Sequence, residues 1–254
     1  MIELGVIRND TYIASKNGED EVYVVFEGEY SEGDELRFIP DGCGFYVLDL
    51  GLGKNLVYSN GSPFDFQIPF GEKKLPYPPQ SFTGEIHYLY GRKAYDFELG
   101  YGIVSKNIYD HSRNETLYPH SRANIETRGE SVFASRNAFD GFIASSGHGK
   151  WPYESWGINR DPDAELFLDF GRDVKTDRIV FYTRADFPHD AWWDRVTVEF
   201  SDGSSTVLNL VKKDGAQIFE IKERRISSLT VKNLIKSDDP SPFPALIQLE
   251  VYGK

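Results

Sequence analysis

Short alternating runs of apolar and polar residues, separated by turn residues, constrain this chain more than any other feature. In the segment VTVEFSDGSSTVLNL, residues 196–210, two such runs flank Asp202 and Gly203. Side chains of a strand point alternately to its two faces, and Asp-Gly supplies the positive φ angles of a tight turn. A second pair, Asp214 and Gly215, predicts another hairpin between NLVKK and AQIFEI. Both segments therefore predict antiparallel strands.

The same pattern of short apolar runs separated by turn residues extends over most of the chain. The runs EVYVVFEGEY, CGFYVLDL, FDFQIPF and EIHYLYG precede residue 100, and ELFLDFG, RIVFYT, VTVEF, STVLNL, QIFEI, SSLTVK and ALIQLEVYG follow residue 160. Gly, Pro and Asn-Gly separate them, and no amphipathic helix of three turns is indicated. The segment 105–130 is polar and irregular. The sequence predicts an all-β protein of two tandem β-sandwich domains, residues 1–120 and 121–254.

Charge and cysteine content exclude several classes of function. The formal net charge is −12, and an acidic chain is repelled by phosphate backbones and anionic lipids, so nucleic acid and membranes are not expected as partners. Cys43 is the single cysteine, which rules out a disulfide within the chain and a site with two cysteine ligands. No secretory signal or long apolar run is present, and we expect a cytoplasmic location. The sequence does not indicate the oligomeric state.

Five motifs in order resemble a known family. They are ASRNAFDG (134–141), DPDAELFLDFG (161–171), RIVFYTR (178–184), VTVEFSDG (196–203) and ALIQLEVYG (245–253), with Trp156 between the first two. This series, over about half of the chain, resembles the discoidin-like domain, also called the coagulation-factor C-type or galactose-binding-like jelly roll. The resemblance implies a jelly-roll β-sandwich that binds ligands through loops at one end, and bacterial members are often carbohydrate-binding modules. Residues 1–120 match no family.

Two loops carry the side chains that suit a sugar. A pyranose stacks its apolar face on an aromatic ring, while its hydroxyls pair with donors and acceptors such as Arg, His and Asn. One stretch, RADFPHDAWWDR (184–195), and the other, SSGHGKWPYESWGINR (145–160), both contain such residues. We predict that residues 148–160 and 184–195 form opposite walls of one ligand site. The candidate ligand-binding residues are His148, Trp151, Asn159, Arg160, Arg184, His189, Trp192 and Trp193.

The tryptophans allow a structural interpretation as well. Trp156 matches a core position of the family and is assigned to packing. Adjacent residues of an extended segment point to opposite sides, so one of Trp192 and Trp193 is expected to be buried and the other to face the loops. The sequence does not decide which. Trp193 could equally begin the following strand and cover the core.

The resemblance also implies a structural calcium beneath the binding loops. The family uses an aspartate of the DG motif, backbone carbonyls and a carboxylate near the C-terminal end. Asp140 stands at the first position, and Gln248 or Glu250 at the last. Calcium prefers about six to eight oxygen ligands, so Gln248 could serve only as a neutral one. The alternative is that Asp140 and Gly141 form a plain turn.

Catalysis is not expected. No nucleophile motif such as Gly-x-Ser-x-Gly is present. A glycosidase needs two carboxylates at a defined separation, and Asp186, Asp190 and Asp194 are the first candidates beside the proposed site. The sequence favours non-catalytic carbohydrate binding, with a saccharide or glycan as the partner. A glycoside hydrolase or lyase with a site between the two domains, or a protein-interaction module, is the alternative.

Overall fold

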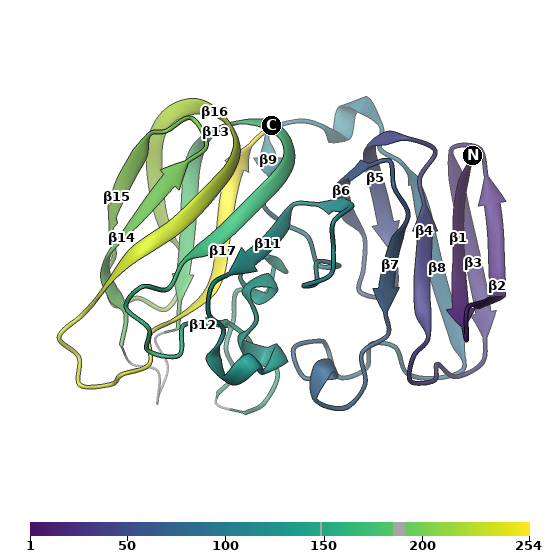
Figure 1. Ribbon diagram of the computed structural model, residues 1–254, viewed down its shortest axis with the longest axis horizontal. Coiled ribbons are helices and arrows are strands. Elements are labelled where there is room, and N and C mark those ends of the chain that lie inside the picture. Colours follow the sequence, from purple (N-terminus) through teal and green to yellow (C-terminus); the bar gives the residue numbers. More distant parts are fainter. Residues whose placement is uncertain (148, 185–190) are drawn as a thin grey trace.

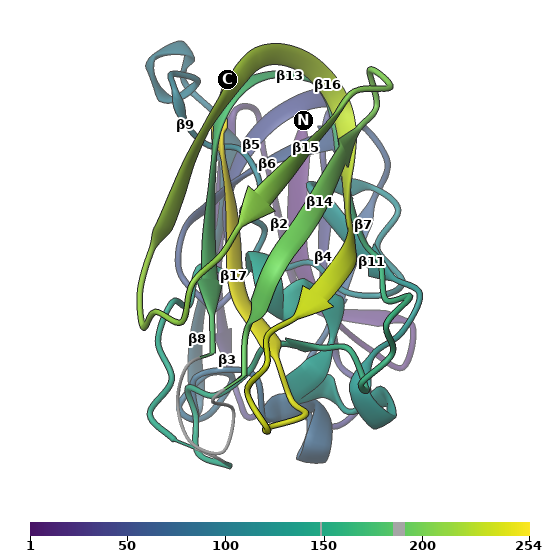
Figure 2. The same cartoon turned by 90° about the vertical axis from the view of Figure 1, so that its left-hand side faces the viewer.

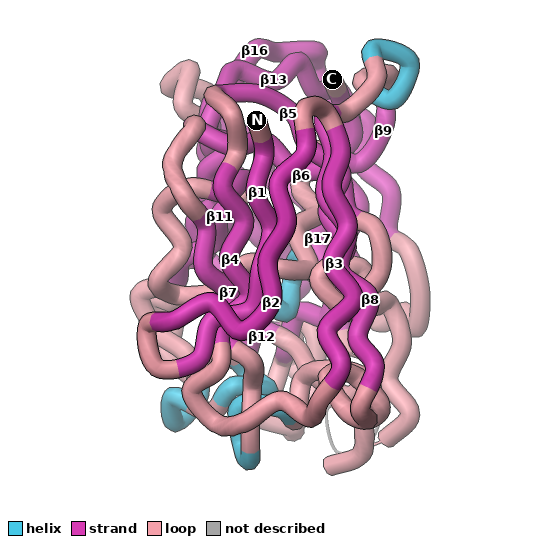
Figure 3. The backbone as a smooth tube through the Cα atoms, turned by 90° about the vertical axis from the view of Figure 1, so that its right-hand side faces the viewer, coloured by secondary structure: helices cyan, strands magenta, loops and turns pink. Residues whose placement is uncertain are grey.

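The N-terminal unit is a sandwich of two antiparallel sheets. The computed structural model describes residues 1–147, 149–184 and 191–254. One sheet has the order β2-β1-β4-β7, and the other has the order β10-β6-β5-β8-β3. Figures 1 and 3 show them as two layers, with β3 and β8 side by side. The strands are β1 (Ile2–Arg8), β2 (Thr11–Gly18), β3 (Glu21–Glu27), β4 (Glu35–Ile39), β5 (Cys43–Asp49), β6 (Asn55–Asn60), β7 (Phe64–Gln67), β8 (Ile86–Lys93) and β10 (Leu117–Tyr118).

Alternating residues of these strands build the first core. In β3 the buried residues are Val22, Val24 and Phe26, while those between them face solvent. The inward residues of both sheets meet in one cluster that includes Leu4, Phe38 and many others. The outward face of the five-stranded sheet is rich in tyrosine and phenylalanine instead. The alternation read from the sequence is therefore the alternation that fills this core.

The C-terminal unit is one curled sheet of eight strands. Its order is β12-β17-β13-β16-β14-β15, with β11 paired to β13 and β9 paired to β17. The strands β13 and β16 are long, and their pairing with each other is interrupted by two register shifts. Figure 2 shows both strands bending over the top of the unit. The strands are β9 (Gly102–Ile103), β11 (His120–Ala123), β12 (Trp156–Gly157), β13 (Leu166–Thr183), β14 (Trp193–Phe200), β15 (Ser205–Asn209), β16 (Gln217–Lys236) and β17 (Ala245–Gly253).

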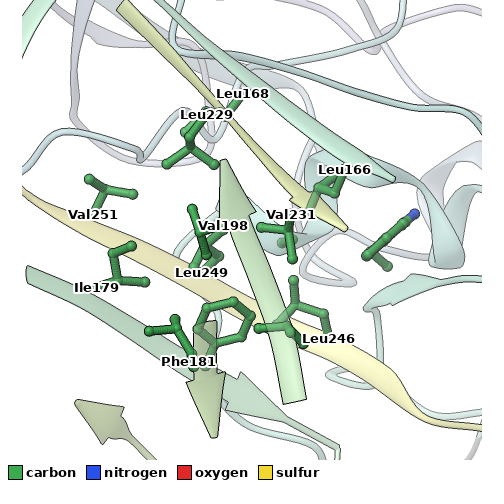
Figure 4. Close-up of a cluster of buried hydrophobic side chains, with 14 of the residues drawn as sticks. Leu166, Leu168, Ile179, Phe181, Val198, Leu229, Val231, Leu246, Leu249 and Val251 are labelled. Carbon is green, nitrogen blue, oxygen red and sulfur yellow. The ribbon is translucent and has the colours of Figure 1, made fainter. Parts of the chain in front are cut away.

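The sheet encloses a second core of aliphatic and aromatic side chains. Figure 4 shows Ile179 of β13, Val198 of β14, Val231 of β16 and Val251 of β17 in the same cluster. Trp156 is fully buried in this core, which confirms its assignment to packing. The prediction of an all-β protein is confirmed as well.

Helical segments are short in the described part of the chain. They are the 3-10 turns η1 (Gly71–Lys74), η2 (Asp96–Glu98), η3 (Thr127–Gly129), η4 (Ser131–Phe133) and η5 (Ser135–Phe139). None of the helices among the described residues is long and apolar enough to cross a bilayer. Three of them, η3 to η5, lie at the lower end of the C-terminal unit in Figure 1, beside β12.

Two local predictions need correction. Asp202 and Gly203 do join a hairpin, because Glu199 of β14 pairs with Ser205 of β15. Asp214 and Gly215 do not, since β15 pairs only with β14 while β16 pairs with β13 and β14. The pieces ELFLDFG and RIVFYT are also one strand, β13, and QIFEI and SSLTVK are one strand, β16. Turn residues such as Asp-Gly indicate where the chain bends, but they do not indicate which strand the following segment pairs with.

The chain passes between the units more than once. Residues of β9 pair with β17, although β10 after them still pairs with β6. Pro119 then separates β10 from β11, which belongs to the C-terminal unit. The crossing is fixed by Asp110, whose carboxylate accepts hydrogen bonds from His120 Nδ1 and from the amide and hydroxyl of Ser121, each at 2.8 Å. The predicted domain boundary near 120 stays a prediction.

Candidate functional site

Strand ends bring three loops to one end of the C-terminal unit. The Arg184 amide, just after β13, donates to the Ala245 carbonyl at the start of β17 (3.0 Å), and Ala245 pairs with Gly157 of β12. The Ser237 amide after β16 donates to the Trp192 carbonyl before β14 (2.9 Å). We call this the loop end. It is the lower end of the unit in Figures 1 and 2, where the segment after β16 and the turns before β12 meet.

The structure decides between the two adjacent tryptophans. Trp193 is 1% exposed and lies in the core, with its ring centroid 6.5 Å from that of Trp156. Trp192 is only half-buried, and the Lys212 ammonium lies 5.9 Å from its ring centroid. Trp193 is therefore corrected from a ligand-binding candidate to a core residue. Trp192 is the member of the pair that remains available at the loop end.

Arg184 lies beneath the loops. Its side chain is fully buried, and its guanidinium donates to the Tyr153 carbonyl (3.0 Å) and to the Ser145 hydroxyl (3.4 Å). These bonds tie the end of β13 to the segment 142–155. The two loop segments are therefore in contact at Arg184, and the ligand site between them stays a prediction. Because the guanidinium is fully enclosed, we assign it a positioning role and not direct contact with a ligand.

Trp151 packs against its own loop. Its ring makes an edge-to-face contact with Phe142, with the centroids 5.4 Å apart. Its indole Nε1 is buried and has no hydrogen-bond partner among the described residues. A buried indole N–H normally finds an acceptor. The ring is half-buried, so part of it remains accessible beside Arg184.

A pocket of about 370 Å³ opens next to these loops. Asn159 and Arg160, both sequence candidates, line it with φ angles of 49° and 60°. The Arg160 guanidinium lies 5.6 Å from the ring centroid of Phe243 across the pocket. On the other side, the Arg128 guanidinium lies 5.5 Å from the Phe133 ring centroid. The pocket therefore brings two aromatic rings together with the guanidinium groups of Arg128 and Arg160.

Sequence reasoning missed part of this pocket. Phe133, Arg128 and Phe243 come from segments that carried no signal of their own. Only the pairing of β12 with β17 places 157–160 beside 242–245. Two other candidates, His148 and His189, lie outside the described residues, as do Asp186 and Asp190.

The residues proposed for calcium are close together but are already engaged. Asp140 Oδ1 accepts the Phe142 amide (2.9 Å), and Gln248 Oε1 accepts the Gly141 amide (3.2 Å). Glu250 accepts the Tyr252 hydroxyl (3.1 Å). Asp140 Oδ2 remains buried without a hydrogen bond, which is the one feature that favours a cation.

Two positively charged side chains already lie beside Asp140 and Gly141, where a bound metal ion would add further positive charge. An Arg136 guanidinium nitrogen lies 4.0 Å from Asp140 Oδ2. Lys106 passes so close to Gly141 that a Cβ there would lie 2.7 Å from Lys106 Cε. The described residues also contain no group of three or more His, Cys, Asp or Glu able to hold a metal. One free carboxylate oxygen beside two cations falls short of the oxygen-rich shell of calcium, so this donor set does not fit the ion.

Carboxylates with a raised pKa lie away from the clefts. Burial raises the pKa of Asp140 to about 8 and also raises the pKa of Glu154 and of Glu250. In the clefts between the units the direction is opposite. Arg92 lowers the pKa of Glu98 to about 2, and Arg128 lowers the pKa of Glu130. Neither carboxyl can hold a proton for transfer at neutral pH.

Comparisons with known proteins return solved structures only. No family model matches the sequence, and no curated protein matches it. A fucose-binding module from Streptococcus pneumoniae is 14% identical, covering 64% of this chain and 100% of its own, with a TM-score of 0.43. Chitosan-binding module 1 from a chitosanase/glucanase of Paenibacillus sp. IK-5 is 17% identical, covering 60% and 99%, with a TM-score of 0.42.

Two further matches differ in kind. The lectin-binding domain of Lectinolysin, complexed with Lewis b, is 12% identical, covering 60% of this chain and 96% of its own, with a TM-score of 0.45. The structure named SpGH29 is 15% identical, covering 59% of this chain and only 28% of its own, with a TM-score of 0.41. Carbohydrate-binding modules of the galactose-binding-like fold, the group that the sequence motifs resemble, stand among the matches. Every quoted TM-score is below 0.5, so the ligand has to be inferred from the residues of this chain and not from these matches.

Proposed function

We propose that this chain binds a carbohydrate without transforming it, through the loop end of the C-terminal unit. The pocket of about 370 Å³ between Arg160 and Phe243 is the observation that carries this proposal. Its volume lies in the range of about 300–1,000 Å³ that is usual for small-ligand sites. Trp192 adds a half-exposed ring at the same end.

The chemistry of this pocket suits a saccharide. Phe243 is exposed and offers a flat apolar face for the C–H face of a pyranose, while Phe133 is buried in the wall of the pocket. Arg160 and Asn159 offer N–H donors and an amide oxygen for hydroxyl groups. Left-handed backbone at 159 and 160 forms a tight turn, which sets the direction in which both side chains leave the chain.

Catalysis between the two units is the less favoured alternative. One cleft there is lined by the side-chain carboxylates of Glu98 and Asp173, and another cleft by those of Glu72, Glu126 and Glu130. Glu98 is held ionised by a bidentate contact with Arg92, at 2.7 and 2.6 Å. A glycosidase needs one carboxyl that is protonated near neutral pH. The pKa values of Glu98 and Glu130 are lowered by their arginine partners, so neither carboxyl suits that role.

A glycan array with the whole chain tests the proposal, followed by a turnover assay on each hit. Fucose, galactose and Lewis b, which the solved structures contain or are named for, are natural first probes. Binding without product formation is the expected result. Product formation would favour the enzyme alternative. The absence of any glycan ligand would contradict carbohydrate binding and leave a protein-interaction module as the remaining candidate.

A further inference from the structure

A second cleft, of about 640 Å³, lies between the two units. One wall is the outward face of β5, β6 and β10, where Phe45, Tyr58 and Tyr118 point away from the first core. The opposite wall is the bend of β13 at 170–175 together with the segment 97–104. In Figure 1, β9 and this bend lie on the side of the C-terminal unit that faces β6.

Arg172 is the distinctive residue of this cleft. Its guanidinium lies 4.7 Å from the Phe45 ring centroid and donates to the Asp173 carbonyl at 3.0 Å. No salt bridge joins it to a carboxylate within the described ranges, although the chain carries 40 acidic residues. The side chain is partly buried, and desolvation lowers its pKa. A guanidinium removed from water without a counter-ion is costly, and an anion bound in the cleft would offset that cost.

The backbone at Gly171 fixes where Arg172 points. Gly171 has a φ of 65°, and a Cβ there would lie 2.3 Å from the Tyr118 ring. The bend therefore packs directly on Tyr118, and only glycine permits that approach. Arg172 follows immediately, so its side chain is directed across the cleft toward Phe45.

The acidic residues of the cleft are already paired. Glu98 binds Arg92 through both carboxylate oxygens. Asp173 lies 3.9 Å from the Arg225 guanidinium. An anion that approaches Arg172 therefore meets no uncompensated carboxylate among the described residues of the cleft.

We propose that this cleft binds an acidic saccharide, with the sugar carboxylate on Arg172 and the sugar rings against Tyr58, Tyr118 and the exposed aromatics of the 97–104 segment. A guanidinium fork matches a carboxylate in geometry and in single charge. Phe97 at the mouth is 82% exposed and Tyr101 is also exposed. Flat aromatic surfaces spread over both walls suit several sugar rings in sequence.

The two proposed sites are independent. Lys254 lines the cleft and Ala245 lines the pocket at the loop end, so β17 separates them. Nine residues of strand span about 30 Å. Failure of sugar binding at the loop end would leave this proposal standing, and the reverse is also true.

Calorimetric titration with a galacturonic acid trisaccharide tests the cleft, with the neutral galactose trisaccharide as the matched probe. The acidic probe is expected to bind the parent, with an affinity that falls as salt increases. Arg172→Gln is expected to weaken that binding by about tenfold or more, because a charge-assisted hydrogen bond is lost. Arg178→Gln is the control, since Arg178 lies on the same strand and bonds Glu220 on the surface (3.2 Å). Trp192→Ala at the loop end should leave this affinity unchanged.

A second variant keeps the test decisive if Arg172→Gln is unstable. Phe97→Ala removes an exposed ring outside either core and should lower the affinity for the acidic probe while the thermal melt is unchanged. The proposal is overturned if the acidic trisaccharide does not bind, or if Phe97→Ala and every folded Arg172 variant bind it like the parent. It is also overturned if inorganic sulfate or phosphate binds as tightly as the trisaccharide, because the site is then a simple anion site.

Discussion

Replacing Trp193 by alanine should destabilise the C-terminal unit far more than replacing Trp192. Removing a large buried aromatic side chain typically costs about 3–5 kcal/mol of unfolding free energy. The Trp193 indole Nε1 is buried without a partner among the described residues, so truncation also removes an unsatisfied donor that costs ~1 kcal/mol or more. We therefore expect about 3 kcal/mol for Trp193→Ala.

Trp192→Ala should cost less than ~1 kcal/mol. Its ring is half-buried, and the contact with Lys212 at 5.9 Å is at the far limit of a cation–π interaction. Trp193→Phe is the matched control, because phenylalanine keeps most of the ring and lacks the orphan N–H. We expect Trp193→Phe to lie between the parent and Trp193→Ala.

Denaturant unfolding followed by tryptophan fluorescence measures these differences. All four tryptophans lie between residues 151 and 193, so the signal reports the C-terminal unit alone. A loss of about 3 kcal/mol corresponds to a Tm that is lower by roughly 6–12 °C for a protein of this size. Equal losses for Trp192→Ala and Trp193→Ala, or a larger loss for Trp192→Ala, would refute the placement of Trp193 in the core.

Three further predictions follow from the structure. Burial raises the pKa of Asp140 to about 8, so the folded state holds this proton more tightly than the unfolded state does, and stability falls as pH rises from about 4 to 8. Asp140→Asn should therefore raise the unfolding free energy at pH 9 and have little effect at pH 4, as measured by chemical denaturation. Millimolar calcium should leave the Tm the same as in the presence of a chelator. A bound calcium ion would instead stabilise the fold by about 2.7 kcal/mol at a hundredfold excess over Kd. A Tm that rises with calcium would therefore support the calcium site predicted from the sequence. A fragment of residues 121–254 keeps strands β12–β17, most of β11 and every buried residue of the second core. It should therefore give the circular dichroism of a folded β protein, with a lower Tm because it lacks β9. A spectrum of unfolded chain would contradict the predicted boundary.

The sequence predicted those parts of the structure that depend on local pattern. Alternation identified β3, β5 and β14, and Asp202-Gly203 identified the hairpin between β14 and β15. The burial of one of two adjacent tryptophans follows from the same alternation. By contrast, the sequence predicted that a strand ends at Gly171, whereas β13 bends there and continues to Thr183.

Features that depend on packing between distant segments could not be predicted. Phe243 faces Arg160 only because β17 pairs with β12. Arg172 lies over Phe45 only because the two units pack against each other. In the sequence, Phe243 and Arg172 look like ordinary surface residues, because nothing near them indicates which residues they contact. The roles of His148 and His189 stay predictions.

Calorimetric titration of the strongest glycan hit into three variants tests carbohydrate binding at the loop end most directly. Phe243→Ala and Trp192→Ala each remove an accessible ring of that end, and Tyr23→Ala removes an exposed ring of the N-terminal unit as the control. Truncation of a central aromatic anchor typically costs about 2 kcal/mol or more, which is roughly a thirtyfold loss of affinity. We expect such a loss for at least one loop-end variant, with unchanged thermal melts and parent-like binding by Tyr23→Ala. Parent-like binding by both loop-end variants would contradict the proposed site.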